Sequence, residues 1–275
     1  MYPELSFSLF GSAYTIFSYD LFAVLAILSV ILLTPLSFMR AKKPVLKGVA
    51  LSCVLLIIFV VGSRLLNYFI NPAQYGDNFA LTSLGFKGFS LYGGLILSGL
   101  TLPFVSKAFG IKSLEAADRL ILPCGIAFIL SRTGCYLNGC CSGKSTKSIL
   151  GVVFPLRKAE KLIIDKLPFS FGFDQIRVYP TQLFELIIAA LGLFLIPTLS
   201  KRFGLKTGST ALLYAVWFTA MRLGVLPFRS LPYAPFVVDV FYPVVYVAII
   251  LFCLALFCKI NLNTKSPNGK TKMPE

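Results

Sequence analysis

Seven long apolar segments limit what this chain of 275 residues can fold into. A helix needs roughly 20 mostly apolar residues to cross the hydrocarbon core of a bilayer, because each residue adds only about 1.5 Å to its length. Hydrophobic residues make up 57% of the chain and charged residues only 13%, which excludes an ordinary soluble domain. We therefore predict an all-α integral membrane protein with about seven transmembrane helices. The segments run approximately over residues 21–38, 45–61, 91–109, 120–137, 181–199, 209–225 and 237–257.

The remaining segments predict how the chain is organised. No internal repeat is evident, so we expect a single membrane domain over residues 1–260, with a small periplasmic cap at about 138–180. Residues 261–275 are polar and are predicted to form a disordered cytoplasmic tail. Residues 5–19 are apolar and are expected to lie at the membrane interface or to extend the first span. They lack a basic leading region, and Asp20 interrupts them, so a cleaved signal peptide is not expected.

Basic residues in the short connections predict the orientation. Lysine and arginine follow the first, third and fifth segments and recur after the seventh. Such residues favour the cytoplasmic side, so we expect the C-terminus inside and the N-terminus outside. The same residues account for the net charge of +15, because they can contact anionic lipid. Nucleic-acid binding is not expected, since the charge is scattered and forms no continuous basic face.

Arg132, near the end of the fourth apolar segment, suggests a binding site. Residues 131–144 read SRTGCYLNGCCSGK, and a guanidinium at the membrane boundary usually faces a cavity, a carboxylate or a lipid phosphate. Arg64, Arg222 and Arg229 also lie near outer ends of segments. A cluster of such planar donors around one cavity would hold a phospholipid headgroup. For Arg64 and Arg229, anchoring of helix ends in the headgroup region is an equal alternative.

Two further polar residues stand near span ends. Tyr92 precedes two adjacent glycines, which allow a backbone or ligand to approach closely, although an interfacial tyrosine can also be a membrane-belt residue. Glu185 lies on the segment after Pro180. It is expected to be either the structural counter-ion of one arginine or a direct catalytic group.

The cysteines fall into two groups, and the chain has no histidine. Those in or beside apolar helices behave as small hydrophobes. Cys135, Cys140 and Cys141 instead share one turn, where a disulfide between Cys135 and either neighbour is plausible. A zinc site is less favoured because no further ligand is near in sequence, and a redox centre is a third interpretation. We predict no metal and no cofactor. The first group comprises Cys53, Cys124, Cys253 and Cys258.

The order of these motifs resembles the bacterial prolipoprotein diacylglyceryl transferase family, from Ser18 to Arg229. The resemblance implies a seven-helix enzyme of the bacterial plasma (inner) membrane. It moves the diacylglyceryl group of phosphatidylglycerol onto the lipobox cysteine thiol of a prolipoprotein and leaves glycerol phosphate. The implied partners are phosphatidylglycerol, prolipoprotein lipobox peptides and the lipid bilayer, without nucleic acid. The motifs are Arg64, Tyr92-Gly93-Gly94, Arg132-x-Gly134-x-x-x-Asn138-Gly139, Pro180-x-Gln182-x-x-Glu185, Arg222 and Arg229.

The resemblance also implies roles for individual residues. Arg132 and Arg222 match the essential arginines of the family, and with Tyr92 and Glu185 they form the expected catalytic set. We expect the arginines to favour an acceptor thiolate and to stabilise the departing phosphate. The residues expected to bind phosphatidylglycerol are Arg64, Arg132, Asn138, Gly139, Gln182, Arg222 and Arg229.

The chain departs from the family pattern at several positions. Tyr92 and Tyr179 stand where the family usually has histidine, and Cys135 and Cys140 replace an asparagine and a glutamate. Phe218 stands where tyrosine is common. The sequence is therefore similar to a divergent member that lacks the family histidines. Two alternatives remain open: a related lipid transferase with a different acceptor, and a non-catalytic phospholipid-binding membrane protein.

Overall fold

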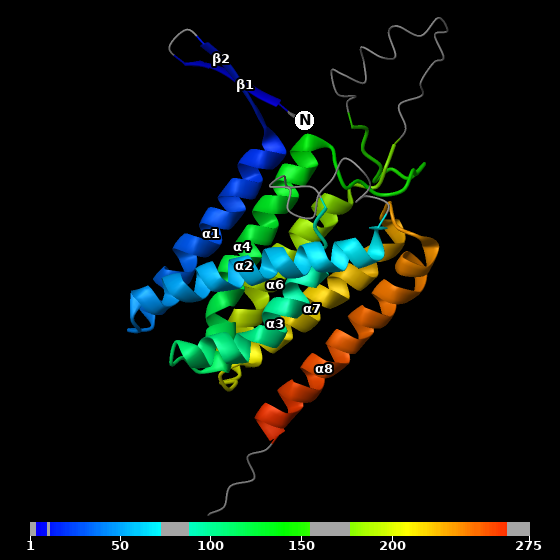
Figure 1. Ribbon diagram of the computed structural model, residues 1–275. Helices are drawn as coiled ribbons and strands as arrows, with labels where there is room; N and C mark the ends of the chain where they lie inside the picture. Colours follow the sequence, from blue (N-terminus) through cyan, green and yellow to red (C-terminus); the bar gives the residue numbers. More distant parts are fainter. Residues whose placement is uncertain (1–3, 10–11, 73–87, 155–176, 263–275) are drawn as a thin grey trace, which may run out of the picture.

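Long helices make up most of the computed structural model, which describes residues 4–9, 12–72, 88–154 and 177–262. Seven helices in these ranges are long and apolar enough to cross a membrane, which confirms the predicted all-α multi-pass membrane protein. Short helical turns η2 (Leu226–Phe228) and η3 (Val237–Phe241) extend the last two of them. The helices are α1 (Ser18–Arg40), α2 (Val45–Ile70), α3 (Leu91–Ala108), α4 (Ser113–Asn138), α6 (Thr181–Arg202), α7 (Ser209–Val225) and α8 (Tyr242–Leu262) (Figure 1).

Two helices extend well beyond the apolar segments that predicted them. The second segment was predicted to end at residue 61, but α2 continues to Ile70, and α4 begins at Ser113 instead of residue 120. Arg64 and Asn67 in the added part of α2 are buried. A polar side chain that is buried against protein does not have to leave the membrane region, so the helix continues past the apolar run.

The chain before α1 forms a two-stranded antiparallel sheet. Strand β1 (Glu4–Leu9) pairs with β2 (Ser12–Phe17), with Glu4 opposite Phe17. Of the two alternatives for residues 5–19, an extension of the first span is wrong, because α1 begins only at Ser18. A position at the membrane interface stays a prediction. The alternation of apolar and polar residues in the run LSFSL has the period of two that is typical of a strand.

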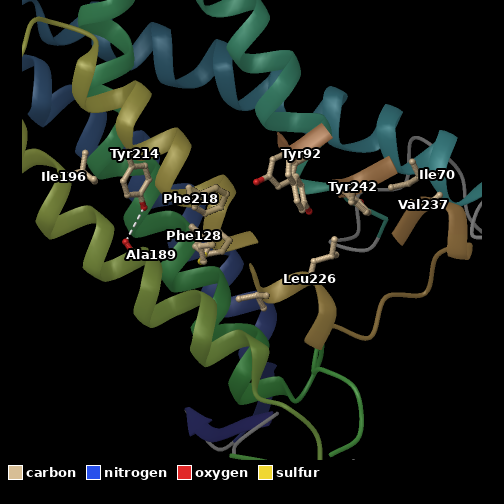
Figure 2. Close-up of a cluster of buried hydrophobic side chains, with 13 residues drawn as sticks. Ile70, Tyr92, Phe128, Ala189, Ile196, Tyr214, Phe218, Leu226, Val237 and Tyr242 are labelled. Carbon is tan, nitrogen blue, oxygen red and sulfur yellow. Dashed lines mark hydrogen bonds between the residues drawn. The ribbon is translucent and has the colours of Figure 1, made fainter. Parts of the chain in front are cut away.

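A layer of aromatic side chains joins α4, α6 and α7 inside the bundle (Figure 2). The rings of Phe128 on α4 and Phe218 on α7 meet edge to face with their centroids 4.7 Å apart. Tyr214, one turn before Phe218, donates a hydrogen bond to the carbonyl oxygen of Ala189 on α6 at 3.5 Å. These contacts bring the C-terminal ends of α4 and α7 close to the N-terminal end of α6.

The opposite end of the bundle is fixed by Asp118. Its carboxylate accepts hydrogen bonds from the backbone amides of Gly208, at 2.6 Å, and Ala211, at 2.9 Å. These amides begin α7 and have no partner within that helix, so a carboxylate from α4 caps it. Asp118 therefore has a structural role at the end of α4 that is remote from Arg132.

Helices α2 and α3 approach closely at two glycines. A Cβ atom added to Gly62 would lie 2.5 Å from the carbonyl oxygen of Gly93, and one added to Gly93 would overlap the backbone of Gly62. Real Cβ atoms essentially never come this close to a backbone atom. The contact between the two helices therefore depends on the absence of side chains at both positions.

Gly93→Ala is expected to lower the unfolding temperature of the detergent-solubilised protein. Alanine in a helix normally favours folding by up to about 1 kcal/mol, but the overlap with α2 should cost about 1–3 kcal/mol and reverse the sign. Gly99→Ala on the same helix is the control, because an added Cβ there meets nothing within 4 Å. Equal shifts in the two variants, measured by thermal unfolding, would contradict this account of the α2–α3 contact.

The segment between α4 and α6 is described only near its two ends. Bridges join Gly143 to Arg229, and Val178 to both Ser145 and Val152. The described parts of the expected cap thus pair with each other through Val178 and, through Gly143, with the chain just after η2. Residues 155–176 of that cap and most of the tail, residues 263–275, lie outside the described residues, so the cap, the tail and the single domain stay predictions.

Candidate functional site

Three arginines converge on one carboxylate where helices α4, α6 and α7 meet. Arg132 comes from the end of α4, Arg222 from the end of α7 and Arg229 from just after η2, while Glu185 lies in the second turn of α6. The Nε atom of Arg132 is 2.8 Å from Oε2 of Glu185. Nη1 of Arg222 donates to Oε1 of Glu185 at 2.6 Å, and Nη1 of Arg229 donates to the same oxygen. These four residues form the arginine–glutamate cluster.

The arginine–glutamate cluster is buried and carries an excess of positive charge. Glu185 is fully buried, and the three arginines are 7–9% exposed. Three guanidinium groups and one carboxylate leave two positive charges uncompensated, since no other carboxylate of the described residues forms an ion pair with them. The buried Nε atoms of Arg222 and Arg229 have no hydrogen-bond partner among the residues that the structure describes. Such a cluster is suited to an anion with several oxygens.

Helical spacing explains why these arginines lie against the aromatic layer. Phe128 and Phe218 each precede an arginine of the cluster, Arg132 and Arg222 respectively, by four residues, which places them one turn below on the same helix face. The guanidinium carbon of Arg132 is 5.0 Å from the ring centroid of Phe128. The aromatic layer therefore lies next to the arginine–glutamate cluster.

Tyr92 on α3 lies next to the arginine–glutamate cluster. The guanidinium carbon of Arg222 is 6.0 Å from the centroid of its ring. On its other side, the Tyr92 ring contacts that of Tyr246 on α8, with a centroid separation of 4.5 Å. The structure thus places Tyr92 beside Arg222, and its role in the site stays a prediction.

The first turn of α6 holds the cysteine-containing turn in place. Nε2 of Gln182 donates to the carbonyl oxygen of Cys140 at 2.7 Å, and Oγ1 of Thr181 donates to that of Cys141 at 3.1 Å. Gly139 ends α4 with a φ of +71°, in the left-handed region where glycine has no steric penalty. Gln182 and Gly139 therefore shape this turn, and Asn138, the last residue of α4, is half-buried beside it.

The structure brings three cysteines together. The Sγ atoms of Cys135, Cys140 and Cys141 all lie within 4.8 Å of one another. All seven cysteines fall within the described residues, and each is a free thiol, so the plausible disulfide is not formed in this structure. Hydrogen bonds from the thiols of Cys135 and Cys140, followed by the charges of Arg132 and Arg229, hold the pKa of Cys141 below its usual range.

Arg64 is not part of the arginine–glutamate cluster. It is buried on α2, and its guanidinium carbon lies 4.3 Å above the ring centroid of Phe89. The ion pairs among the described residues do not join it to Glu185. The structure therefore brings together the predicted residues Arg132, Arg222, Arg229 and Glu185 and leaves Arg64 at a neighbouring helix end.

Sequence reasoning missed the tyrosines of α8 and their partner. Tyr242 and Tyr246 are both buried, and the Tyr242 hydroxyl is 3.5 Å from Oγ of Ser90. Together with Tyr92 they form a row of aromatic rings beside Arg222. Two tyrosines four residues apart in an apolar span lie on one helix face, and this spacing is the signal that would have identified them.

Comparison with known proteins identifies the family of the chain. The model of the prolipoprotein diacylglyceryl transferase family matches residues 6–260. The chain is 33% identical over 147 residues to phosphatidylglycerol–prolipoprotein diacylglyceryl transferase 2 of Clostridium perfringens (strain 13 / Type A), covering 53% of this chain and 52% of that protein. It is 28% identical over 165 residues to phosphatidylglycerol–prolipoprotein diacylglyceryl transferase of Clostridium tetani (strain Massachusetts / E88), covering 60% and 61%.

A longer match of lower identity exists with phosphatidylglycerol–prolipoprotein diacylglyceryl transferase of Clostridioides difficile (strain 630). The two chains are 24% identical over 224 residues, which cover 79% of this chain and 82% of that protein. With the first two relatives, the chain aligns over about half to three-fifths of their length. Since the family model matches nearly the whole chain, this protein belongs to the prolipoprotein diacylglyceryl transferase family.

Proposed function

We propose that this protein transfers the diacylglyceryl group of phosphatidylglycerol to the lipobox cysteine thiol of prolipoproteins and releases glycerol phosphate. The observation that carries the proposal is the arginine–glutamate cluster, with two uncompensated positive charges in a buried position. The names of the relatives support the same reaction. The three arginines supply planar donors that suit phosphate oxygens.

The charge of the arginine–glutamate cluster matches the departing group better than the substrate. The phosphodiester of phosphatidylglycerol carries one negative charge, whereas a phosphate monoester carries about 1.5 to 2 at pH 7. An excess of two positive charges therefore stabilises the transition state, in which this charge develops, more than it stabilises the bound lipid. Such differential stabilisation raises the rate of the chemical step.

Each residue of the site has a separate role in the proposed reaction. The acceptor sulfur attacks the glyceryl carbon, the bond from that carbon to the phosphate oxygen breaks, and its electron pair leaves with glycerol phosphate. Arg132 and Arg222 hold the phosphate, and Arg229 adds charge. Glu185 positions the three arginines, and Tyr92 orients Arg222 or the phosphate. The chain has no histidine to remove the thiol proton, so the arginines also have to favour the acceptor thiolate.

We also propose a location in the bacterial plasma membrane, and the distribution of basic residues supports an orientation with the site on the outer side. Helices α1, α3 and α6 end, and α2, α4 and α7 begin, at the end of the bundle remote from the arginine–glutamate cluster. The positive-inside rule assigns this basic end, and the C-terminus of α8, to the cytoplasm. Its basic residues include Arg40, Lys42, Lys43, Lys107, Lys112, Lys201 and Arg202.

Purified protein in detergent, given phosphatidylglycerol and a lipobox peptide, is expected to release glycerol phosphate in amounts equal to the lipidated peptide. The control peptide has serine in place of the lipobox cysteine and should yield neither product. Lipid binding without release of glycerol phosphate would overturn the transferase proposal and favour a phospholipid-binding protein. Release in membranes without modification of the peptide would instead indicate a different acceptor.

A further inference from the structure

The three clustered cysteines have the geometry of a metal site. Zinc–sulfur bonds are about 2.3 Å long, so three sulfurs around one ion lie roughly 4 Å apart. The Sγ atoms of Cys135, Cys140 and Cys141 are already within 4.8 Å of one another. Movements of less than about 1 Å would therefore bring all three to bonding distance. These sulfurs also form the only group of three potential ligands found among the described residues.

The backbone of this turn is fixed from several directions. Besides the bonds from Gln182 and Thr181, the Cys140 amide donates to the carbonyl oxygen of Cys135 at 3.1 Å. Three residues further on, the Gly143 amide donates to the carbonyl oxygen of Tyr179 at 2.8 Å. Cys141 has a φ of +61°, which residues other than glycine rarely adopt. The sulfurs are thus held together by the fold, and not by a disulfide, as a preorganised site requires.

The composition of the cluster favours a metal over a disulfide. A disulfide uses two thiols and leaves the third without a role, whereas three thiolates form a set that prefers soft ions such as zinc or copper(I). Zinc sites with three protein ligands keep a fourth position open for water or substrate. Cys135 is buried and Cys141 is exposed, so the three cysteines extend from the protein interior to its surface.

The cysteine cluster lies beside the arginine–glutamate cluster. Arg132 and Cys135 are three residues apart on α4. On α6, Glu185 lies three residues after Gln182, which donates to the carbonyl oxygen of Cys140. The charges of Arg132 and Arg229 act on Cys141. A metal held by the three sulfurs would therefore be close to the arginines that are proposed to hold the departing phosphate.

We propose that Cys135, Cys140 and Cys141 bind one thiophilic cation of the zinc class, whose open position takes the acceptor thiol. The binding of the acceptor thiol to this open position rests on the proposed transferase function. A thiol bound to such an ion is deprotonated, so in a chain without histidine this arrangement adds to the stabilisation of the thiolate by the arginines. The thiol proton passes to solvent, the sulfur forms its bond to the glyceryl carbon, and the carbon–oxygen bond breaks as glycerol phosphate leaves. The thioether product is neutral, binds the ion weakly and departs.

Titration of the reduced, chelator-treated full-length protein in detergent with Zn²⁺, and separately with Cd²⁺, tests the site. We expect one ion per chain, with the ultraviolet absorption of cadmium–thiolate bonds in the Cd²⁺ titration. Cys135→Ser, Cys140→Ser and Cys141→Ser should each weaken binding at least about tenfold. Cys124→Ser is the matched control, because this exposed cysteine lies on the same helix as Cys135 and outside the cluster, and it should bind as wild type. Retained binding of phosphatidylglycerol shows that each variant is folded.

Binding that does not depend on the three cysteines, or no binding at all, would overturn the site. The site would also be overturned if the purified protein contained a disulfide between Cys135 and either Cys140 or Cys141 and bound no ion after reduction.

The role in transfer is tested separately with the lipobox peptide. Metal-free protein should be at least about tenfold slower than zinc-loaded protein, and added Zn²⁺ should restore the rate. Full activity of the metal-free protein would overturn the role of the metal and leave the transferase standing. Cysteine-dependent zinc binding by a protein that releases no glycerol phosphate would leave the metal site standing and overturn the transferase.

Discussion

The Glu185→Gln protein is expected to unfold on the order of 10 °C below the wild type, because one change removes the counter-charge of three buried arginines. Removing one partner of a buried ion pair costs about 3–5 kcal/mol. Glutamine keeps the shape of the side chain, so the effect reports on charge and not on packing. The excess in the arginine–glutamate cluster rises from two positive charges to three, and the guanidinium groups then repel one another.

The matched control for this prediction is Glu115→Gln. Glu115 also faces two cations, Lys43 and Arg119, but both ion pairs are 3.7 Å long and lie nearer to the solvent. Ion pairs of this kind contribute about 0–1 kcal/mol, so the unfolding temperature should change little. Anionic phosphatidylglycerol should restore part of the stability of Glu185→Gln, because it supplies negative charge to the arginines. If Glu185→Gln were as stable as Glu115→Gln, Glu185 would not hold the arginine–glutamate cluster together.

The seven spans could be predicted from the sequence because bilayer thickness sets the length of an apolar helix. The prediction was wrong where protein, and not lipid, surrounds a helix end. The added turns of α2 contain Arg64 and Asn67. Such polar residues predict the end of a span from hydropathy, but both are buried in the structure. Strand β1 was also missed, because residues 5–9 were read for their apolar content and not for their alternation.

The residues of the arginine–glutamate cluster could be recognised individually, since a charged residue beside an apolar run has few explanations. Their convergence could not be predicted, because it depends on how α4, α6 and α7 pack around Phe128 and Phe218. Arg64 illustrates the difference: it has the same sequence signature as Arg222 but stacks on Phe89. The cysteine cluster was visible as a turn, yet only the fold shows all three sulfurs within 4.8 Å.

Arg132→Ala and Arg222→Ala are each expected to slow glycerol phosphate release by at least about 100-fold while leaving the protein folded. Loss of one group that stabilises developing negative charge typically costs 10²–10³ in rate, or roughly 3–4 kcal/mol. Either change lowers the excess of the arginine–glutamate cluster from two positive charges to one, and Glu185 remains paired with two arginines. The unfolding temperature should therefore fall less than in Glu185→Gln. The rate is measured with phosphatidylglycerol and the lipobox peptide.

Two comparisons separate charge from geometry in these arginine variants. Arg222→Lys keeps the charge but loses the planar pair of donors, so its rate should lie between those of wild type and Arg222→Ala. Arg119→Ala, a partly exposed arginine on α4 remote from Glu185, should keep the wild-type rate. If the ion pairs only stabilised the fold, Arg222→Ala and Glu185→Gln would both be unstable, and the fraction of each variant that remains folded would be active. A site that binds a departing phosphate predicts instead that Arg222→Ala is stable and inactive, and wild-type release by this variant would exclude that role.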